Sequence, residues 1–165
     1  APSRLTSGEQ SPLVIFSDNK LQNFDTISFS SYNTNSLNIS IHLNYAISPR
    51  FDIEFNIDAA GLSFGSARTA DYNSSKRAQS PDKNTKQNAR PTPFNALLIS
   101  DNDIGNLNSE IFVKYWFNPR WAVKAGGTFV FAEYTTDNEL FLNNDRFRNK
   151  VFLGMIGLSF SPYRN

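Results

Sequence analysis

Residues 36–65 alternate between apolar and polar side chains for about thirty positions, with one break at Ser48-Pro49-Arg50. Because side chains in a strand switch faces at every residue, this alternation predicts a long β-hairpin with one apolar and one polar face. Ordinary strands average about 5–6 residues, and these two are roughly twice as long. A tilted strand needs about 9–11 residues to cross a bilayer, and these strands are long enough to do so.

A second break, Asn118-Pro119-Arg120, interrupts another alternating run in the same way. Proline cannot donate to the hydrogen-bond ladder, so both breaks are predicted to be turns. A three-residue connection keeps the faces in phase, whereas a slip of one residue would exchange them. The predicted opposite pairs are Tyr45 with Ile53, Leu43 with Phe55, Ile41 with Ile57, Tyr115 with Val123 and Val113 with Ala125.

Composition narrows the class of protein. A chain of 165 residues is expected to form one domain, and its net charge of +1 gives no reason to expect a nucleic-acid partner. The chain has no cysteine, which excludes disulfides and thiolate metal sites. No run of about 18 apolar residues occurs, so a transmembrane helix is not expected. The mean hydropathy of −0.42 is still compatible with membrane-spanning strands, because every second residue of such a strand is polar.

The whole chain is predicted to be all-β, as an antiparallel up-and-down transmembrane β-barrel of about 8 strands. Residues 1–23 are expected to be an N-terminal polar segment, and residues 24–165 the barrel domain with a long outer loop at 66–92. Six strands are predicted directly, and segments 11–19 and 93–101 are candidates for the others. The six strands are 24–33, 36–48, 51–65, 107–118, 121–136 and 147–161.

Two arrangements share this pattern: a soluble lipocalin-like barrel with its apolar face inward, and a membrane barrel with its apolar face toward lipid. Strand length favours the membrane, and so does the contrast between short turns at one end and longer connections at the other. Aromatic residues also gather on the apolar face near the short turns, as in an interfacial girdle. This predicted girdle consists of Tyr45, Phe51, Tyr115, Phe117, Trp121 and Phe160.

Two corners and the final alternating strand, which ends at Phe160, are similar to those of a known group of proteins. The corners are Tyr45-Ala46-Ile47-Ser48-Pro49-Arg50-Phe51 and Trp116-Phe117-Asn118-Pro119-Arg120-Trp121. The chain resembles the small outer-membrane β-barrel proteins of Gram-negative bacteria, the OmpA-barrel, OmpX-like and OmpW-like group. The resemblance implies an outer-membrane location, with a signal peptide already removed, and membrane lipid as a partner. It is one of pattern and turn style over residues 24–161.

The polar face is predicted to line a closed lumen with a network of paired charges, because small barrels have interiors filled by side chains. Lys114 and Lys124 are predicted to stand opposite each other, so each should pair with a carboxylate across the lumen. The network consists of Asp52, Glu54, Asp58, Glu110, Lys114, Lys124 and His42.

Few residues suggest chemistry. His42 is in phase with Ser40, but no strained nucleophile turn accompanies them, so no catalytic residue, and no enzyme activity, is predicted. An outer-membrane lipid hydrolase that uses His42 is kept as an alternative. A cluster of oxygen ligands lacks the spacing of a calcium loop, and no metal or cofactor is expected. This cluster consists of Asp101, Asp103, Asn106, Asn108 and Glu110.

The segment 66–92 is basic and poor in aromatics, which disfavours single-stranded nucleic acid as a partner. At an outer rim its cations could contact lipopolysaccharide phosphates. The anion-contacting residues are predicted to be Arg68, Lys76, Arg77, Lys83, Lys86 and Arg90. The leading hypothesis is an outer-membrane barrel that acts through its loops or through a protein partner in the envelope. The alternatives are a soluble periplasmic barrel that binds an apolar ligand, and the lipid hydrolase.

Overall fold

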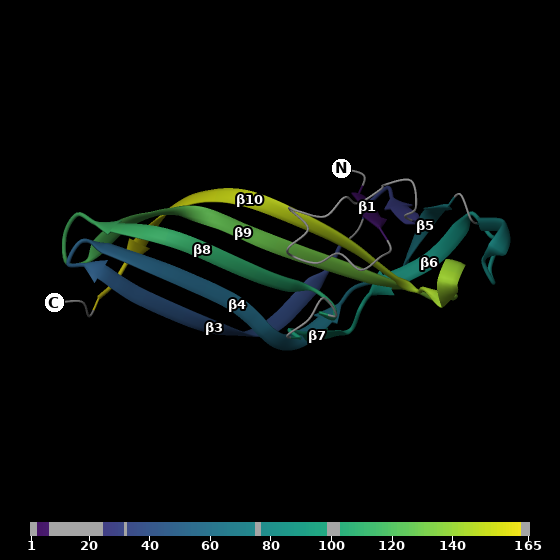
Figure 1. Ribbon diagram of the computed structural model, residues 1–165, viewed down its shortest axis with the longest axis horizontal. Helices are drawn as coiled ribbons and strands as arrows, with labels where there is room; N and C mark the ends of the chain where they lie inside the picture. Colours follow the sequence, from purple (N-terminus) through teal and green to yellow (C-terminus); the bar gives the residue numbers. More distant parts are fainter. Residues whose placement is uncertain (1–2, 7–24, 32, 75–76, 99–102, 163–165) are drawn as a thin grey trace.

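The computed structural model describes residues 3–6, 25–31, 33–74, 77–98 and 103–162. Within these residues the fold is all-β, with ten strands in one antiparallel sheet and two three-residue 3-10 helices (Figure 1). The strands are β1 (Ser3–Thr6), β2 (Thr26–Phe29), β3 (Asn35–Ser48), β4 (Phe51–Phe64), β5 (Arg68–Asn73), β6 (Lys86–Pro91), β7 (Phe94–Ala96), β8 (Leu107–Trp116), β9 (Trp121–Thr136) and β10 (Arg146–Phe160). The helices are η3 (Arg77–Gln79) and η4 (Phe141–Asn143).

Five long strands make up the body of the sheet, in the order β3-β4-β8-β9-β10 (Figure 1). They contain 14, 14, 10, 16 and 15 residues. All five predicted cross-strand pairs are observed, from Tyr45 with Ile53 to Val113 with Ala125. The apolar phase of each strand therefore continues across its neighbours, as the alternation predicts. β-Bulges interrupt the β3–β4 register at Ile39/Ser40 and Ala46/Ser48.

In both short turns, one side chain accepts hydrogen bonds from two backbone N–H groups of the turn. The Ser48 hydroxyl accepts hydrogen bonds from the backbone N–H groups of Arg50 (3.3 Å) and Phe51 (3.1 Å). The Asn118 carbonyl oxygen accepts the equivalent pair from Arg120 and Trp121, each at 2.9 Å. A side chain that accepts from the backbone two and three residues ahead stabilises a tight turn. Both turns lie at the same end of the molecule, on the left in Figure 1.

The short strands gather at the opposite end, which we call the ring end. There the pairings run from β10 through β1, β2, β5 and β6 to β9, and β9 also pairs with β10. A hydrophobic core fills this end and includes Phe29, Tyr72, Tyr134 and Phe147. Phe29 and Tyr134 stack in a tilted geometry with their ring centroids 4.9 Å apart. The main apolar core thus lies at the ring end, where the short strands meet the ends of β9 and β10.

The sheet does not close into a barrel around the long strands, so the predicted eight-strand barrel is corrected. In the described part of the chain β3 pairs with β4 alone, and β10 meets β1 at one position, Thr6 with Arg148. Four antiparallel pairings separate β3 from β10, so the two edge strands run in the same direction. An all-antiparallel closure between them would require an odd number of further strands.

Three predicted segments also differ from the structure. The strand predicted at 24–33 is the short β2, which belongs to the ring end. The predicted loop 66–92 contains β5 and β6, which pair with each other and extend the sheet. The candidate strand 93–101 includes only the three-residue β7, which pairs with β4. The candidate strand 11–19 lies outside the described residues. No described helix has the length and apolar character needed to cross a membrane.

Candidate functional site

The three central long strands, β4, β8 and β9, bury their polar face more deeply than their apolar face. On β4, Asp52 is 1% exposed while the neighbouring Ile53 is 36% exposed. On β8, Phe112 is 2% exposed beside Ile111 at 50%, because Phe112 lies on the same face as the polar side chains. Water-soluble proteins rarely leave a contiguous apolar surface larger than a few hundred Å² exposed. The exposed apolar face is therefore the feature of this molecule that most requires a partner.

We call this surface the apolar belt, and it crosses all five long strands. On β3 it extends from Leu37 to Ile47, both more than half exposed. At about 3.3 Å per residue those positions lie roughly 33 Å apart along the strand. A tilt of about 40° reduces this to about 25 Å, the height of the apolar band in membrane barrels. The exposed large residues of the belt are Leu37, Ile39, Ile41, Leu43, Tyr45, Ile47, Phe51, Ile53, Leu62, Ile111, Val113, Tyr115, Trp121, Val123, Phe129, Phe152, Ile156, Leu158 and Phe160.

An aromatic row borders the belt near the short turns. All six residues of the predicted girdle are exposed there. The rings of Phe51 and Tyr115 stack across β4 and β8 with centroids 5.0 Å apart. Those of Trp121 and Phe160 stack across β9 and β10 at 4.8 Å. These are the separations of favourable aromatic pairs.

A second aromatic group, which the sequence analysis missed, borders the belt toward the ring end. Phe129 on β9 and Phe152 on β10 face each other with ring centroids 4.8 Å apart. Phe64 at the end of β4 and Phe94 on β7 are exposed as well. The signal was present in the sequence, because Phe129 and Phe152 fall in the apolar phase of their strands. Only the pairing of β4 with β7 brings Phe94 to the same border.

On the polar face, two carboxylates of β4 find their partners on β8. The Asp52 carboxylate accepts a hydrogen bond of 2.7 Å from the indole N–H of Trp116. Glu54 forms a largely buried ion pair with Lys114. The prediction that Lys114 pairs with a carboxylate is thus confirmed, but the partner is on the adjacent strand and not across a lumen. Such a partly buried pair holds β4 and β8 in register.

Lys124 stands directly opposite Lys114 in the register, as predicted. It does not pair with a carboxylate among the described ion pairs; its ammonium lies 4.2 Å from the centroid of the Phe112 ring. Gly126, the register partner of Phe112, leaves room for that ring, since an added Cβ would come within 2.8 Å of it. The cation–π contact stabilises the Lys124 ammonium.

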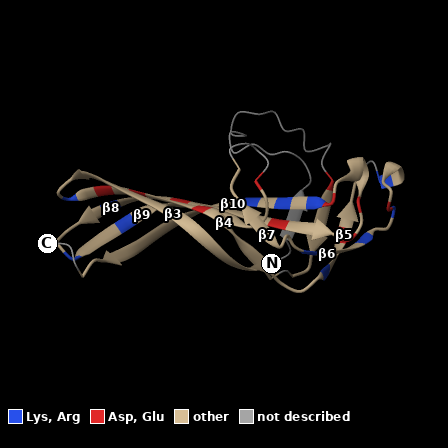
Figure 2. Ribbon diagram, turned by 90° about the horizontal axis from the view of Figure 1, so that it is seen from below, with Lys and Arg blue, Asp and Glu red and all other residues tan. Residues whose placement is uncertain are grey.

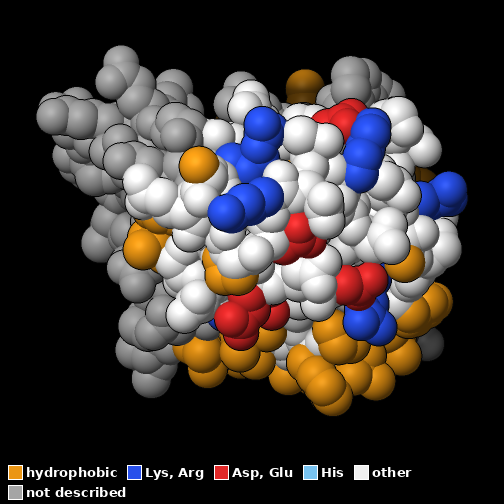
Figure 3. All heavy atoms as spheres, turned by 90° about the vertical axis from the view of Figure 1, so that its right-hand side faces the viewer, with side chains coloured by type: hydrophobic (Ala, Val, Ile, Leu, Met, Phe, Trp, Pro, Cys, Tyr) orange, Lys and Arg blue, Asp and Glu red, His pale blue; other side chains and the backbone are white. Residues whose placement is uncertain are grey.

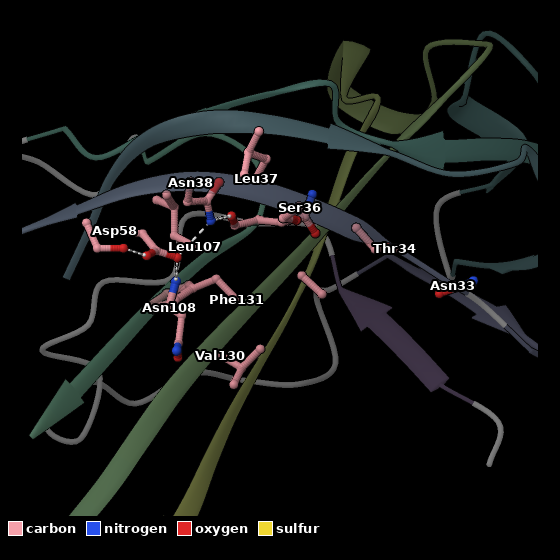
Figure 4. A pocket seen from close by; sticks show the side chains of 13 residues that line it. Asn33, Thr34, Ser36, Leu37, Asn38, Asp58, Leu107, Asn108, Val130 and Phe131 are labelled. Carbon is pink, nitrogen blue, oxygen red and sulfur yellow. Dashed lines mark hydrogen bonds between the residues drawn. The ribbon is translucent and has the colours of Figure 1, made fainter. Parts of the chain in front are cut away.

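The remaining predicted carboxylates are held by neutral donors. Asp58 accepts hydrogen bonds from the Asn38 amide (2.7 Å), the Ser40 hydroxyl (2.6 Å) and the Asn108 backbone N–H (2.9 Å). Glu110 accepts from the side chains of Asn56 (3.1 Å) and Asn108 (3.2 Å). Figure 4 shows Asp58 with Asn38 and Asn108 at a pocket of about 720 Å³ that polar and apolar side chains line. The predicted network is therefore divided into two sets: Asp52, Glu54 and Lys114 near the turns, and Asp58 and Glu110 toward the ring end.

His42 lies exposed on β3 opposite Asn56, in the predicted register. A Ser/His pair requires the serine hydroxyl to donate to the imidazole. The Ser40 hydroxyl donates to Asp58 instead. This geometry gives no support to the hydrolase alternative.

The edge strand β10 departs from the predicted polar lining. Its residues on the same face as Lys124 and Asp52 are Val151, Leu153 and Met155, all exposed. Both faces of β10 are therefore apolar over this stretch, whereas β4 and β8 carry carboxylates on theirs. The polar face has its charges on β4, β8 and β9.

The basic residues of segment 66–92 are spread over the hairpin β5–β6 and its connection. Lys86 pairs with Asp71 at 2.5 Å, and Arg90 pairs with Asp137 at 3.1 Å. Arg68 and Lys83 are exposed, Arg77 is half-buried in η3, and Lys76 lies outside the described residues. At this end of the molecule, charged side chains of both signs are scattered over the surface, and hydrophobic ones gather along one edge (Figure 3). Acidic partners thus offset two of the predicted anion-contacting cations.

The predicted oxygen cluster does not assemble within the described residues. The Asp103 carboxylate accepts from the Leu98 backbone N–H at 2.8 Å, and the Asn106 amide binds the Glu133 backbone. Asp101 lies outside the described residues. Among the residues described, no group of three or more His, Cys, Asp or Glu side chains is arranged to hold a metal ion.

Two groups beyond the belt have shifted pKa values. Burial raises the pKa of Tyr72, whose hydroxyl donates to Asp25 at 2.7 Å inside the ring end. The backbone N–H of Asn84, followed by the Gln87 amide, lowers the pKa of Asp82 by hydrogen bonding to its carboxylate. The Tyr72 shift reports burial in the ring-end core, and the Asp82 shift reports hydrogen bonds in the connection between β5 and β6.

Comparison of the chain with models of protein families, with curated proteins and with solved structures finds no match. The function is therefore argued from the belt, the polar face and the ring end.

Proposed function

We propose that this protein is an integral outer-membrane β-sheet protein whose long strands span the bilayer. The apolar belt contacts acyl chains, the polar face is enclosed, and the ring end projects into water. The protein acts through the ring end, by contacting lipopolysaccharide or a protein partner of the envelope, and it is not an enzyme. The resemblance to small outer-membrane barrels supplies the location.

One observation carries this proposal: the inverted burial of the central long strands β4, β8 and β9. Val123 is 38% exposed and its neighbour Ala122 is 0% exposed, as for Ile53 and Asp52. In water, an exposed face of this size costs about 25 cal/mol for each Å² left uncovered. Acyl chains remove that cost without any specific contact. The strand pairings satisfy the backbone of β4, β8 and β9, and the open edges of β3 and β10 require a further pairing within the bilayer.

The soluble alternative predicts that the apolar residues of the long strands pack against one another. Ile41 and Val123 are instead exposed, and the buried hydrophobic cluster lies at the ring end. The observation therefore favours the membrane protein over a lipocalin-like barrel.

The two tryptophans of the chain provide the test, because they lie on opposite faces near the same turn. Trp121 is exposed in the aromatic row, and Trp116 is buried against Asp52. Trp116→Phe leaves Trp121 as the sole indole, and Trp121→Phe leaves Trp116. Each variant is refolded into phosphatidylcholine vesicles that contain lipids brominated along the acyl chain, and its fluorescence quenching is measured.

We expect strong quenching of Trp121 and weak quenching of Trp116, since bromine quenches only at contact. Equal quenching of both, or stronger quenching of Trp116, would contradict the assigned orientation. A wild-type protein that remains monodisperse in buffer without detergent and ignores vesicles would instead support the soluble alternative. Unbrominated vesicles provide the control for environment-dependent changes in emission.

A further inference from the structure

The five long strands leave two open edges, one on β3 and one on β10. Within the described residues, β3 pairs with β4 alone, and β10 from Val151 to Phe160 pairs with β9 alone. The highest exposures in the apolar belt occur at these edges, such as 74% for Ile39 and 84% for Ile156, against 36% for Ile53 on the central β4. The bilayer interior has no hydrogen-bonding solvent, so an open edge there leaves backbone N–H and C=O groups unsatisfied.

Neither edge has the charged residues or prolines that commonly protect a free strand edge from pairing with another strand. β3 and the open stretch of β10 contain no Asp, Glu, Lys, Arg or Pro. The Lys and Arg residues of β10 all lie toward the ring end (Figure 2). These two edges therefore have the composition of strands that are paired on both sides.

At the ring end, a single strand lies between β10 and the next strand of the ring. The strands there form a closed ring in the order β9-β10-β1-β2-β5-β6. β1 joins β10 to β2, because Thr6 is the register partner of both Arg148 and Thr26. β1 is antiparallel to both of these neighbours. One antiparallel strand is therefore enough to complete the sheet at this level.

The strands of the ring continue the strands of the belt one for one. β3 follows β2 in the chain after residues 30–34, and β5 follows β4 after residues 65–67. Each pair runs in one direction, since β2 and β3 are both parallel to β10, and β4 and β5 are antiparallel to them. β6 and β8 lie on the same edge of β9, at residues 134–136 and 122–131. Among the described residues only β1 is not continued by a long strand, so the gap between β3 and β10 continues the position of β1.

A strand that continued β1 toward the short turns would pair with both edges. It would be antiparallel to β10 and β3 alike, because these two strands run in the same direction. In the register of Thr6 with Arg148, the residue twelve positions upstream of Thr6 faces Phe160, twelve positions beyond Arg148. A strand of about twelve residues is long enough to cross a bilayer. A second copy of the chain would instead bring five long strands and set β3 against β10 in parallel, which a space one strand wide does not accommodate.

We propose that one β-strand fills the gap between β3 and β10, continuous with β1 and formed by polypeptide upstream of Ala1. This inference rests on the proposed function, since it is the bilayer interior that makes the open edges unfavourable. Residues of this strand that share a face with Thr6 and Phe152 contact lipid and are apolar, because side chains alternate along a strand. The residues between them point inward and cover Leu153 and Met155, which are exposed on the polar face of the sheet. The belt then closes with six strands, as the ring end already does.

The experiment uses engineered disulfides, since the chain contains no cysteine of its own. The protein is extended before Ala1 by about eight residues in which valine and threonine alternate. In one version the valines take the phase of Thr6, and in the control version the same alternation is shifted by one residue, which turns the valines inward. Both versions carry a cysteine ten positions upstream of Thr6, which faces Leu158 on β10 in the register of β1. Leu158→Cys is the partner on the open edge, and Val123→Cys is the matched control, because β9 has strands on both sides.

In phosphatidylcholine vesicles, we expect the in-phase extension to form a disulfide with Leu158→Cys within one chain. The disulfide should be lost in the shifted version and with Val123→Cys. The same extension cysteine should also form a disulfide with one of three belt positions on β3, replaced singly. These positions are Leu43→Cys, Tyr45→Cys and Ile47→Cys.

Absence of the disulfide with Leu158→Cys, or equal yields from the two phases, would overturn the proposal. So would a disulfide between two unextended chains that carry Leu43→Cys and Leu158→Cys, because a second copy would then pair β3 with β10. The intact mass of the protein from its native membrane tests the source of the strand. A mature chain that begins at least twelve residues upstream of Thr6 supports the proposal, and one that begins at Ala1 overturns it.

The added strand and the proposed function fail in different ways. A protein whose Trp121 is quenched by brominated lipid, but whose in-phase extension forms no disulfide, refutes the strand and leaves the proposed function intact. A protein that fails to insert both with and without the in-phase extension refutes the proposed function itself.

Discussion

Replacing Ile111 with arginine tests the lipid contact of the belt at its middle. Ile111 lies on β8 six residues before Phe117, about 20 Å along the strand and about 15 Å along the membrane normal. Phe117 follows the end of β8 near the short turn, and both side chains are at least half exposed. An arginine at residue 111 would thus lie near the bilayer midplane, while one at residue 117 would lie near an interface.

The expected magnitudes differ with depth. Ile111→Arg should lower the free energy of unfolding by about 2–4 kcal/mol and Phe117→Arg by about 0–1 kcal/mol. In water, an exposed substitution of either kind would change it by about 0.5 kcal/mol or less. The same pair of variants therefore separates a lipid environment from an aqueous one.

The assay is equilibrium unfolding from phosphatidylcholine vesicles by guanidinium chloride, with linear extrapolation and a check that unfolding and refolding curves coincide. The slope of the transition should stay constant across the variants, which shows that the same surface is exposed. A change below about 0.5 kcal/mol for Ile111→Arg would refute the reasoning. So would equal costs at the two depths, because a bilayer makes them unequal.

Three further predictions concern packing, charge and pH. Gly126→Ala should lower the free energy of unfolding by about 1–3 kcal/mol, because the added Cβ would lie 1.9 Å from a carbonyl oxygen of β8. Gly154→Ala is the control and should leave stability unchanged, because no atom lies within 4 Å of its added Cβ. Thermal unfolding compares the two variants. Lys114→Met should lower the free energy of unfolding by about 3–5 kcal/mol, because it leaves the largely buried Glu54 unpaired. In a double-mutant cycle, adding Glu54→Leu should restore most of the lost stability. Additive losses in the two single variants would argue against the ion pair. The raised pKa of Tyr72 stabilises the folded state fully below pH 10.0, the usual value, and this stabilisation is lost as pH rises through the folded-state pKa. Unfolding free energies measured between pH 8 and 11, approximately, should therefore fall less steeply for Tyr72→Phe than for the wild type.

The long strands show how much a local pattern can predict. Alternation assigned Ile53 and Val113 to one face and Asp52 and Lys114 to the other, and the Pro-containing turns set the register that the structure confirms. These features depend on neighbours within a few residues, so the sequence contains all the information that they need. The opposition of Lys114 and Lys124 followed from the same register.

The errors came from contacts between distant segments. The predicted loop 66–92 forms β5 and β6 because these segments pair with the edges of β2 and β9, which lie far away in the chain. Lys124 was assigned a carboxylate, since a sequence does not reveal that the Phe112 ring lies over Gly126 and within its reach.

The sequence by itself determined that this is an all-β chain with long two-faced strands, because side-chain alternation is a property of each strand alone. The tertiary structure decided that the sheet stays open between β3 and β10, that the short strands form the ring end, and that Glu133 joins Arg146 and Arg148 above the belt. The physical reason is that strand pairing and charge neutralisation are long-range. Each depends on which edges and which side chains the fold brings within a few ångströms.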